Sequence, residues 1–328
     1  MASIRDVAKL ANVGPATVSR VLNETGYVSA ETRKKIEKAM QELNYTPNEL
    51  ARNLYHKKTG IIAILVPTVA HPFFSEFVND IEIELHEKNY KAMLCNTSIA
   101  GNAELEYLDM LNRHIVDGII SGVHSNDIEI YQKMKKPIVA LDRYLGEDIP
   151  VVAVNHKRGG RMAAEELLRN GCRKVLHFRG ALSVESPYHE RHYEFDRMMR
   201  EHDVEVHSYE LERNRFDSQY YEKVIADVFS KKIPFDGVFG VDLLAIGYMN
   251  EALRRGIRVP KDLKLVSYDG TYVTGMVEPK MTTVVQPIAE LAKEAVQLID
   301  LLVNGKSLQG KRIELDVTLQ RGMTTLDC

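Results

Sequence analysis

Two short amphipathic helices separated by a tight break occupy the first 22 residues, and they constrain the fold more than any other feature of the chain. Apolar residues of the first helix follow the i, i+3, i+4, i+7 spacing that buries one helical face, namely Ile4, Val7, Ala8 and Ala11. Ser3 lies three residues before Asp6 and can cap this helix. Residues 12–14 end in glycine and break the helix, so the chain must turn at once.

The second helix begins at a proline, which is favoured at the first helical position. Its outward face carries small and polar side chains and one guanidinium, namely Pro15, Ala16, Thr17, Ser19 and Arg20, and Asn23 follows it. Two helices of this kind predict a helix-turn-helix whose second helix enters the DNA major groove. We predict that Arg20 reads a guanine edge while Pro15 and Ala16 make apolar contacts. Thr17, Ser19 and Asn23 are expected to position the helix on phosphates.

A third helix is predicted over residues 30–43, after the potential cap Ser29. Its apolar positions are Ile36, Ala39, Met40 and Leu43. An ordinary helical hairpin is the alternative interpretation of residues 1–22. The third helix favours the DNA-binding module, because three helices of this size close a small core.

The run DVAKLANVGPATVSRVLN, followed by GYVSAETRKKI and LNYTPNELARNL, closely resembles the lactose/galactose repressor (LacI-type) family, and the resemblance covers essentially the whole chain. Gly14 is a departure, since the family usually has Ser there, but Gly is a tolerable N-cap. The resemblance implies a homodimer on a pseudo-palindromic operator in double-stranded DNA.

Residues 47–59 form a short linker between Pro47 and Gly60. A helix this short is marginal by itself, so it should fold only when docked. The resemblance implies a hinge helix whose two copies pack in the minor groove and contact DNA through Leu54 and Tyr55, with Leu54 inserted between base pairs. An exposed linker leucine is the alternative for Leu54.

Charge is divided unequally along the 328 residues. Residues 1–58 carry 10 Lys or Arg and 6 Asp or Glu, whereas the whole chain has a net charge of −3, so the positive charge lies at the predicted DNA-binding end. The three cysteines, Cys95, Cys172 and Cys328, have neither disulfide-framework nor zinc-site spacing. We find no apolar signal segment or membrane-spanning run, and we expect a protein of the bacterial cytoplasm that joins the nucleoid when bound to DNA.

From residue 60 onward, apolar runs of strand length alternate with amphipathic helical patterns. The predicted strands are 61–66, 91–95, 116–121, 138–141, 151–154, 174–177, 237–239 and 263–267, and the predicted helices are 74–88, 160–169, 243–254 and 288–302. Repeated βα units predict an α/β fold class with parallel sheets. The resemblance implies the two-lobed fold of periplasmic sugar-binding proteins.

We therefore expect three parts in the chain: a DNA-binding domain at 1–46, a hinge at 47–59, and an effector-binding and dimerisation domain at 60–328. Lobe 1 is expected over about 60–155 and 286–328, and lobe 2 over about 156–285.

Candidate effector-binding residues follow the predicted strands, because α/β sheets bind ligands at the carboxyl ends of their strands. The sequence His71-Pro72-Phe73-Phe74 is similar to the family's NPFF segment, and either Phe73 or Phe74 can stack on a sugar ring while the other belongs to the core. The other candidates are Asp142, Arg143, Asn155, Arg191, Asp269 and Gln286. The resemblance places four of these, Asp142, Arg191, Asp269 and Gln286, in the effector pocket. A surface or strand-capping role is the alternative for Arg143 and Asn155.

The identity of the effector is less constrained. The chain looks most like sucrose operon repressors of Gram-positive bacteria, with ribose repressors next. Val241 replaces an Asn common in the family, and Glu185 stands where a purine-responsive relative would carry Arg, which favours a polyhydroxyl ligand. A sugar phosphate stays open because a basic set follows the strands, namely Arg143, Lys157, Arg158, His189 and Arg191.

Three other classes compete with a sugar-responsive repressor. An exported sugar-binding protein lacks the amino-terminal helices. An enzyme is disfavoured, since G-x-x-x-x-G-K-[ST], H-E-x-x-H and G-x-S-x-G are missing, and we expect no metal or cofactor. A global carbon-catabolite regulator with a phosphoprotein corepressor is the remaining alternative.

Overall fold

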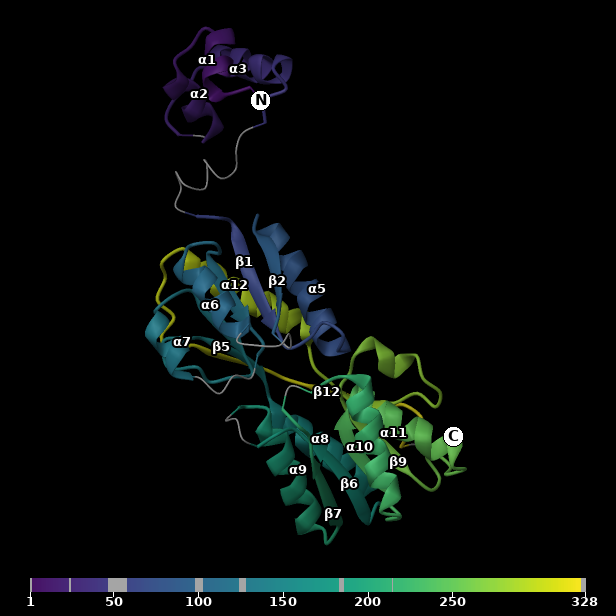
Figure 1. Ribbon diagram of the computed structural model, residues 1–328. Coiled ribbons are helices and arrows are strands. Elements are labelled where there is room, and N and C mark those ends of the chain that lie inside the picture. The colour runs from purple at the N-terminus through teal and green to yellow at the C-terminus, as the bar shows by residue number, and fades with distance from the viewer. Residues whose placement is uncertain are drawn as a thin grey trace. The chain divides into compact units, whose positions relative to one another are not determined.

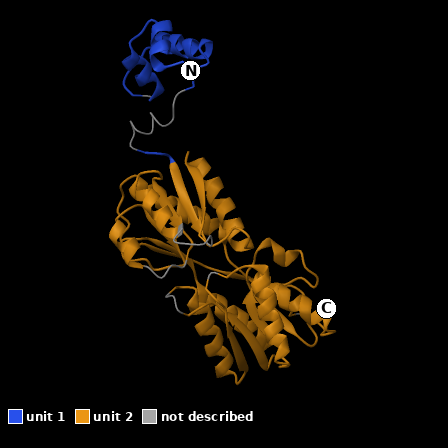
Figure 2. Ribbon diagram, in the orientation of Figure 1, with its two compact units in different colours: residues 1–60 blue, residues 61–328 orange. Residues whose placement is uncertain are grey.

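The computed structural model describes residues 2–23, 25–46, 58–97, 103–123, 128–182, 186–213 and 215–325. The chain divides into two compact units, residues 1–60 and residues 61–328 (Figure 2). No helix within these described ranges is long and apolar enough to cross a membrane.

The described part of the first unit contains three helices, α1 (Ile4–Leu10), α2 (Pro15–Leu22) and α3 (Ala30–Glu42). Ser3 and Asp6 form a reciprocal capping box at the start of α1, and the Ser29 side chain accepts a hydrogen bond from the Thr32 backbone at the start of α3. The three helices share one small apolar core made by Val7, Ala8, Ala11, Val18, Val21, Ile36 and Ala39. The predicted helix-turn-helix and its third helix are therefore confirmed.

The first sheet of the second unit has the strand order β11-β5-β4-β3-β1-β2, and all of its pairings are parallel. Its strands are β1 (Ile61–Val66), β2 (Lys91–Asn96), β3 (Gly118–Ser121), β4 (Ile138–Leu141), β5 (Val151–Val154) and β11 (Arg312–Leu315). Alternate strand residues face opposite helical layers. One face packs against α5 (Pro72–Glu87) and α12 (Ile288–Val303), and the other against α6 (Ala103–Asn112) and α7 (Ile128–Met134) (Figure 1).

The second sheet has the order β12-β10-β9-β8-β6-β7, in which only β12 is antiparallel to its neighbour. Its strands are β6 (Lys174–Arg179), β7 (Glu205–Glu210), β8 (Gly237–Val241), β9 (Lys264–Asp269), β10 (Thr282–Val285) and β12 (Thr318–Gln320). Helices α8 (His156–Arg169) and α9 (His189–Glu201) cover one face, α10 (Ser218–Ser230) and α11 (Asp242–Arg254) cover the other, and a short 3-10 helix, η1 (Tyr272–Gly275), follows β9. The predicted α/β fold with two lobes is confirmed.

The chain passes between the two sheets at three places: after β5, after β10, and between β11 and β12. The expectation that all of 286–328 belongs to lobe 1 is therefore wrong. Strand β12 pairs with β10, and the Thr324 hydroxyl donates to the backbone oxygen of Leu265. Residues 318–325 therefore belong to lobe 2. The physical reason is that the open edge of β10 needs a hydrogen-bonding partner, which the last strand supplies.

Candidate functional site

The outward face of α2 carries the residues predicted to contact DNA. Pro15, Ala16 and Arg20 are exposed. Thr17, Ser19 and Asn23 are partly exposed, and the Asn23 amide donates to the Ser19 hydroxyl at 3.1 Å. The second helix therefore presents the surface that the sequence predicted, and the role of each residue on it stays a prediction.

Leu54 and Tyr55 lie outside the residues that the structure describes. The hinge helix and its leucine wedge thus stay predictions from the sequence.

A cleft in the second unit lies where strand ends of the two sheets meet. It encloses about 1040 Å³, part of which is open to solvent. Its lining includes Leu141 and Asp142 at the end of β4, Val241 at the end of β8, and Tyr268 and Asp269 at the end of β9. The predicted residues that line this cleft are Phe73, Phe74, Asp142, Arg191, Asp269 and Gln286.

Asp142 projects from the end of β4 in the left-handed backbone region, at φ 49°. Its Oδ1 atom lies 2.9 Å from Nε2 of His156, and Nδ1 of the same imidazole lies 3.0 Å from the hydroxyl of Tyr268. The Ser186 hydroxyl donates to the Asp142 backbone oxygen. Residues of lobe 2 therefore hold an acidic residue of lobe 1 at the cleft wall.

Arg191 lies in the first turn of α9, and its guanidinium carbon stands 4.2 Å above the centroid of the Tyr268 ring. Close packing of α8 against α9 sets this position. A Cβ atom at Gly160 would lie only 2.1 Å from the Arg191 backbone oxygen, so no larger residue fits there. The α8–α9 packing thus places the Arg191 guanidinium in the cleft.

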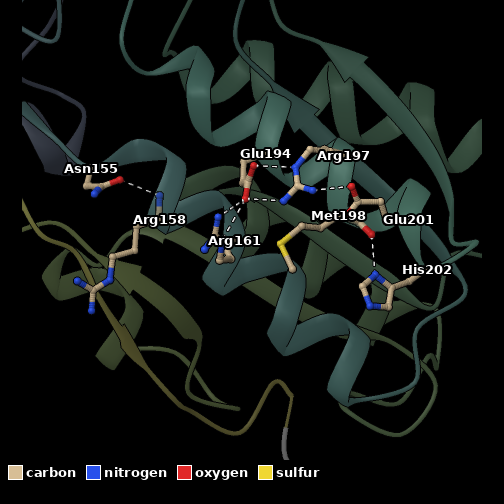
Figure 3. A network of polar contacts seen from close by, with 8 residues as sticks. All are labelled: Asn155, Arg158, Arg161, Glu194, Arg197, Met198, Glu201 and His202. Atoms are coloured by element: carbon tan, nitrogen blue, oxygen red, sulfur yellow. Dashed lines mark hydrogen bonds and ion pairs between the residues drawn. The ribbon is translucent and has the colours of Figure 1, made fainter.

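An ion pair between Arg161 and Glu194 joins the same two helices, and Arg197 of α9 supports it (Figure 3). Nη2 of Arg161 on α8 and Nη2 of Arg197 on α9 lie 2.8 and 2.9 Å from Oε1 of Glu194. Hydrogen bonds from these guanidinium groups, that of Arg197 above all, lower the pKa of Glu194 to about 2. The carboxylate is therefore ionised near neutral pH and fixes α9 on α8.

Asp269 is buried at the end of β9, and its Oδ1 atom accepts a hydrogen bond of 2.8 Å from the Gln286 side chain. Gln286 Oε1 has no hydrogen-bond partner among the described residues. Burial raises the pKa of the Asp269 carboxyl, and the negative charge of Asp242 raises it further. Because Asp269 and Gln286 lie beside Arg191 in the cleft, a ligand there meets an acceptor, an amide and a cation.

Asp242 lies beneath the cleft at the start of α11 and has a structural role. Its carboxylate accepts hydrogen bonds from the hydroxyls of Ser267, Thr271 and Thr283 and from the backbone N–H of Thr271. Burial nevertheless raises its pKa. Neighbouring polar groups already occupy this carboxylate, so it acts on a ligand only through its charge.

Aromatic side chains form one wall of the cleft. His71, Phe73, Phe74 and Phe216 line it, and the ring of Phe216 lies 5.5 Å from that of His71 and 5.6 Å from that of Phe74, edge to face. Phe73 also stacks on Phe77 of the core at 6.2 Å, and both predicted phenylalanines are buried members of the core cluster that also line the cleft. Sequence reasoning missed Phe216, because it lies outside the predicted strands and helices in a polar segment.

His71 is a further cleft residue that the sequence analysis noted but did not assign. It is buried, and neither ring nitrogen has a hydrogen-bond partner within the described residues. Burial lowers its pKa to about 4, so the imidazole is neutral near pH 7.

Arg143 and Asn155 do not line the cleft, and we correct the expectation that placed them there. Asn155 accepts a hydrogen bond of 2.9 Å from the Arg158 backbone and caps α8, which is the strand-end alternative (Figure 3). Arg143 is buried, at 1% exposure, and is not one of the residues that line the cleft. Five basic residues made a sugar phosphate a possible effector in the sequence analysis, namely Arg143, Lys157, Arg158, His189 and Arg191. Of these five, Arg191 alone lines the cleft.

Comparisons with known proteins cover both units. Residues 3–48 match the family model of bacterial regulatory proteins, lacI family, and residues 164–325 match that of a periplasmic binding protein-like domain. A ribose operon repressor of Halalkalibacterium halodurans is 38% identical over 326 residues, which is 99% of this chain and 97% of the relative. A sucrose operon repressor of Streptococcus mutans is 38% identical over 300 residues, covering 91% and 92%.

The fold also resembles that of a solved regulator. A lac repressor dimer, bound to operator and the anti-inducer ONPF, matches 99% of both chains with a TM-score of 0.86 at 25% identity. The predicted resemblance is thereby confirmed, as is the prediction of a regulator rather than an enzyme. With relatives that match from the helix-turn-helix to the last sheet, the chain belongs to the lacI family of bacterial regulatory proteins.

Proposed function

We propose that this protein is a homodimeric transcriptional repressor of a sugar-utilisation operon, which a sugar releases from a pseudo-palindromic operator. The observation that supports this best is the convergence of Asp142, Arg191, Asp269 and Gln286 in one cleft of a chain that also carries a helix-turn-helix. A sugar hydroxyl both donates and accepts a hydrogen bond, so carboxylates, an amide and a guanidinium suit vicinal hydroxyls. Phe73 or Phe74 offers an aromatic edge or face to the apolar side of the sugar ring.

Sucrose or a closely related sugar is the first candidate effector, and ribose is the second. The sucrose candidate rests on segments such as Leu141-Asp142-Arg143-Tyr144-Leu145 and on the sucrose operon repressor at 38% identity. The ribose candidate rests on the ribose operon repressor at the same identity over 99% of the chain.

An unphosphorylated sugar fits these cleft residues better than a phosphate does. The carboxylate of Asp142 lines the cleft together with the guanidinium of Arg191, so a phosphate beside Asp142 would face like charge. A sugar phosphate would have to place its phosphate at the rim, where Arg213 and Arg215 lie. Arg215 already pairs with Glu212 at 3.1 Å and Asp217 at 3.2 Å, so Arg213 would be the main contact.

Release requires that sugar and operator each weaken the binding of the other. A sugar shifts the protein away from the DNA-binding state only by its differential affinity for the two states. By reciprocity, operator DNA must weaken sugar binding by the same factor. The hinge at residues 48–55 is the proposed connection, because its two copies can be helical only when the dimer packs them together on DNA.

The test is calorimetry of the full-length dimer with sucrose, D-ribose and their phosphates, with and without operator. We expect weaker sugar binding in the presence of operator. Equal binding in both conditions would reject the inducer role, and tighter binding would make the sugar a corepressor. The Leu54→Ala variant should lose operator affinity and keep its sugar affinity when free. If none of the probes binds and a phosphorylated carrier protein tightens operator binding instead, the alternative of a global carbon-catabolite regulator holds.

A further inference from the structure

We propose that His156 is a positioning residue that holds the effector-binding groups of both lobes in one arrangement. The inference rests on the proposed function, since it concerns how the same cleft binds its sugar. His156 is the first residue of α8 and is buried, at 2% exposure, so it does not itself line the cleft. It acts through two neighbours that do, Asp142 and Tyr268.

The two ring nitrogens of His156 link one lobe to the other. Nε2 lies 2.9 Å from Oδ1 of Asp142, which follows β4 in the first sheet, and Nδ1 lies 3.0 Å from the hydroxyl of Tyr268, which belongs to β9 in the second sheet. A carboxylate only accepts hydrogen bonds, so Nε2 carries the hydrogen in the neutral ring. Nδ1 is then an acceptor, and the Tyr268 hydroxyl donates to it. In the neutral ring, both hydrogen bonds of His156 therefore have a defined direction.

This arrangement prepares two separate contacts for a sugar. The hydrogen bond from His156 occupies one oxygen of Asp142 and fixes the carboxylate at the cleft wall, where its remaining acceptor positions are left for a hydroxyl. The hydrogen bond from Tyr268 fixes the ring over which the Arg191 guanidinium stands, at 4.2 Å from the centroid. One imidazole therefore orients the anionic group of lobe 1 and supports the cationic group of lobe 2.

The neighbouring backbone is shaped for the same contacts. A Cβ atom at Gly159 would lie 2.6 Å from the Tyr268 hydroxyl, so the first turn of α8 can approach the tyrosine only with glycine at that position. Asp142 adopts a positive φ of 49°, and Ser186 of lobe 2 donates to its backbone oxygen. Preorganised groups bind better because the ligand does not have to order them.

Both ring nitrogens of the buried His156 form hydrogen bonds, so the residue could stabilise the fold without affecting sugar binding. The experiment must distinguish this structural role from positioning. Two substitutions of comparable volume do this. His156→Gln keeps an N–H that can donate to Asp142, whereas His156→Leu keeps only the packing. His202→Gln is the matched control, since His202 is exposed on the same lobe and its imidazole hydrogen-bonds, among the described residues, to the Met198 backbone oxygen.

The experiment measures the dissociation constants of sucrose, D-ribose and their phosphates by calorimetry on the full-length dimer, with thermal melting and operator affinity in parallel. For the sugar that binds the native protein, we expect His156→Leu to weaken binding about tenfold or more and His156→Gln to weaken it by about threefold or less. Operator affinity without sugar should stay native in both variants, and His202→Gln should match the native protein throughout.

Three results would overturn the inference. Native sugar affinity in His156→Leu would show that the histidine does not position the site. Equal losses in His156→Leu and His156→Gln, together with equal losses of melting temperature, would assign it to structure alone. If the native protein itself binds no sugar of the set, the proposed function fails first, and the inference fails with it.

Discussion

The Gly160→Ala variant tests whether the close packing of α8 and α9 positions Arg191. Two effects of the added methyl group oppose each other. Alanine in a helix interior is favoured over glycine by about 1 kcal/mol. The new Cβ atom, however, would lie 2.1 Å from the Arg191 backbone oxygen and 2.8 Å from its Cα atom, where ordinary contacts are 3.4–4 Å.

The steric effect should dominate, because both clashing groups are helix backbone and no rotamer change relieves them. Overpacking of this kind costs about 1–3 kcal/mol, and a backbone clash belongs at the upper end of that range. After the gain in helix propensity, we expect a net loss of about 2 kcal/mol in the free energy of unfolding. For a unit of this size, that loss lowers the melting temperature by about 4–8 °C. Displacement of α9 should also weaken sugar binding, since it carries Arg191 away from Tyr268.

Gly247→Ala is the matched control for this experiment. Gly247 is also a helical glycine of lobe 2, but among the described residues a Cβ atom there meets the Cδ1 tip of the Ile225 side chain, which can rotate away. The control should be as stable as the native protein or slightly more stable, and it should bind sugar normally. Thermal melting and calorimetry of both variants provide the measurements. A Gly160→Ala protein with native stability and native sugar affinity would refute the argument that glycine is required for this packing.

Three further predictions concern other parts of the molecule. Arg20→Ala should cost about 1–3 kcal/mol on operator and relax preference at one base pair per half-site, and equal weakening on operator and random DNA in a gel-shift series would contradict base reading. Asp269→Asn should change the pH dependence of stability. Because folding raises the pKa of this carboxyl, its contribution is present below the ordinary aspartate pKa and is lost as pH rises through the folded value. The free energy of unfolding of the native protein should therefore fall relative to Asp269→Asn between about pH 5 and pH 8, and parallel profiles in urea titrations would contradict this. Glu166→Ala should destabilise lobe 2 by about 1–3 kcal/mol, since Arg321 and Thr325 donate to this buried carboxylate, and a change under about 0.5 kcal/mol in urea would show the contacts to be dispensable.

Much of the fold was predictable because its determinants are local. Strands β1, β4 and β5 are short runs of buried apolar residues, and the predicted ranges 61–66, 138–141 and 151–154 match them. Strand β7 was missed because its burial pattern includes no buried residue, as is typical of a sheet edge, so no apolar run marks it. Strands β11 and β12 were missed for a similar reason, and their partners are distant in the sequence.

The candidate site was predictable where a residue directly follows a strand. Asp142 and Asp269 reach the cleft because parallel strands end at a common edge. The same rule failed for Asn155, because the helix that begins after β5 uses the side chain as its cap. It also gave no indication of His156, whose role depends on Asp142 and Tyr268, 14 and 112 residues away along the chain.

The late position of the last two strands has a consequence for how the protein is made. Strand β11 pairs with β5 at the edge of the first sheet, and β12 pairs with β10 at the edge of the second. During synthesis, strands β5 and β10 therefore stay at the sheet edges, without these partners, until residues 312–320 have left the ribosome. The helix-turn-helix needs only the first 46 residues and can fold long before. A ribosome that stalls near the end of the message would thus release a chain with a complete DNA-binding module attached to two unfinished, aggregation-prone sheets.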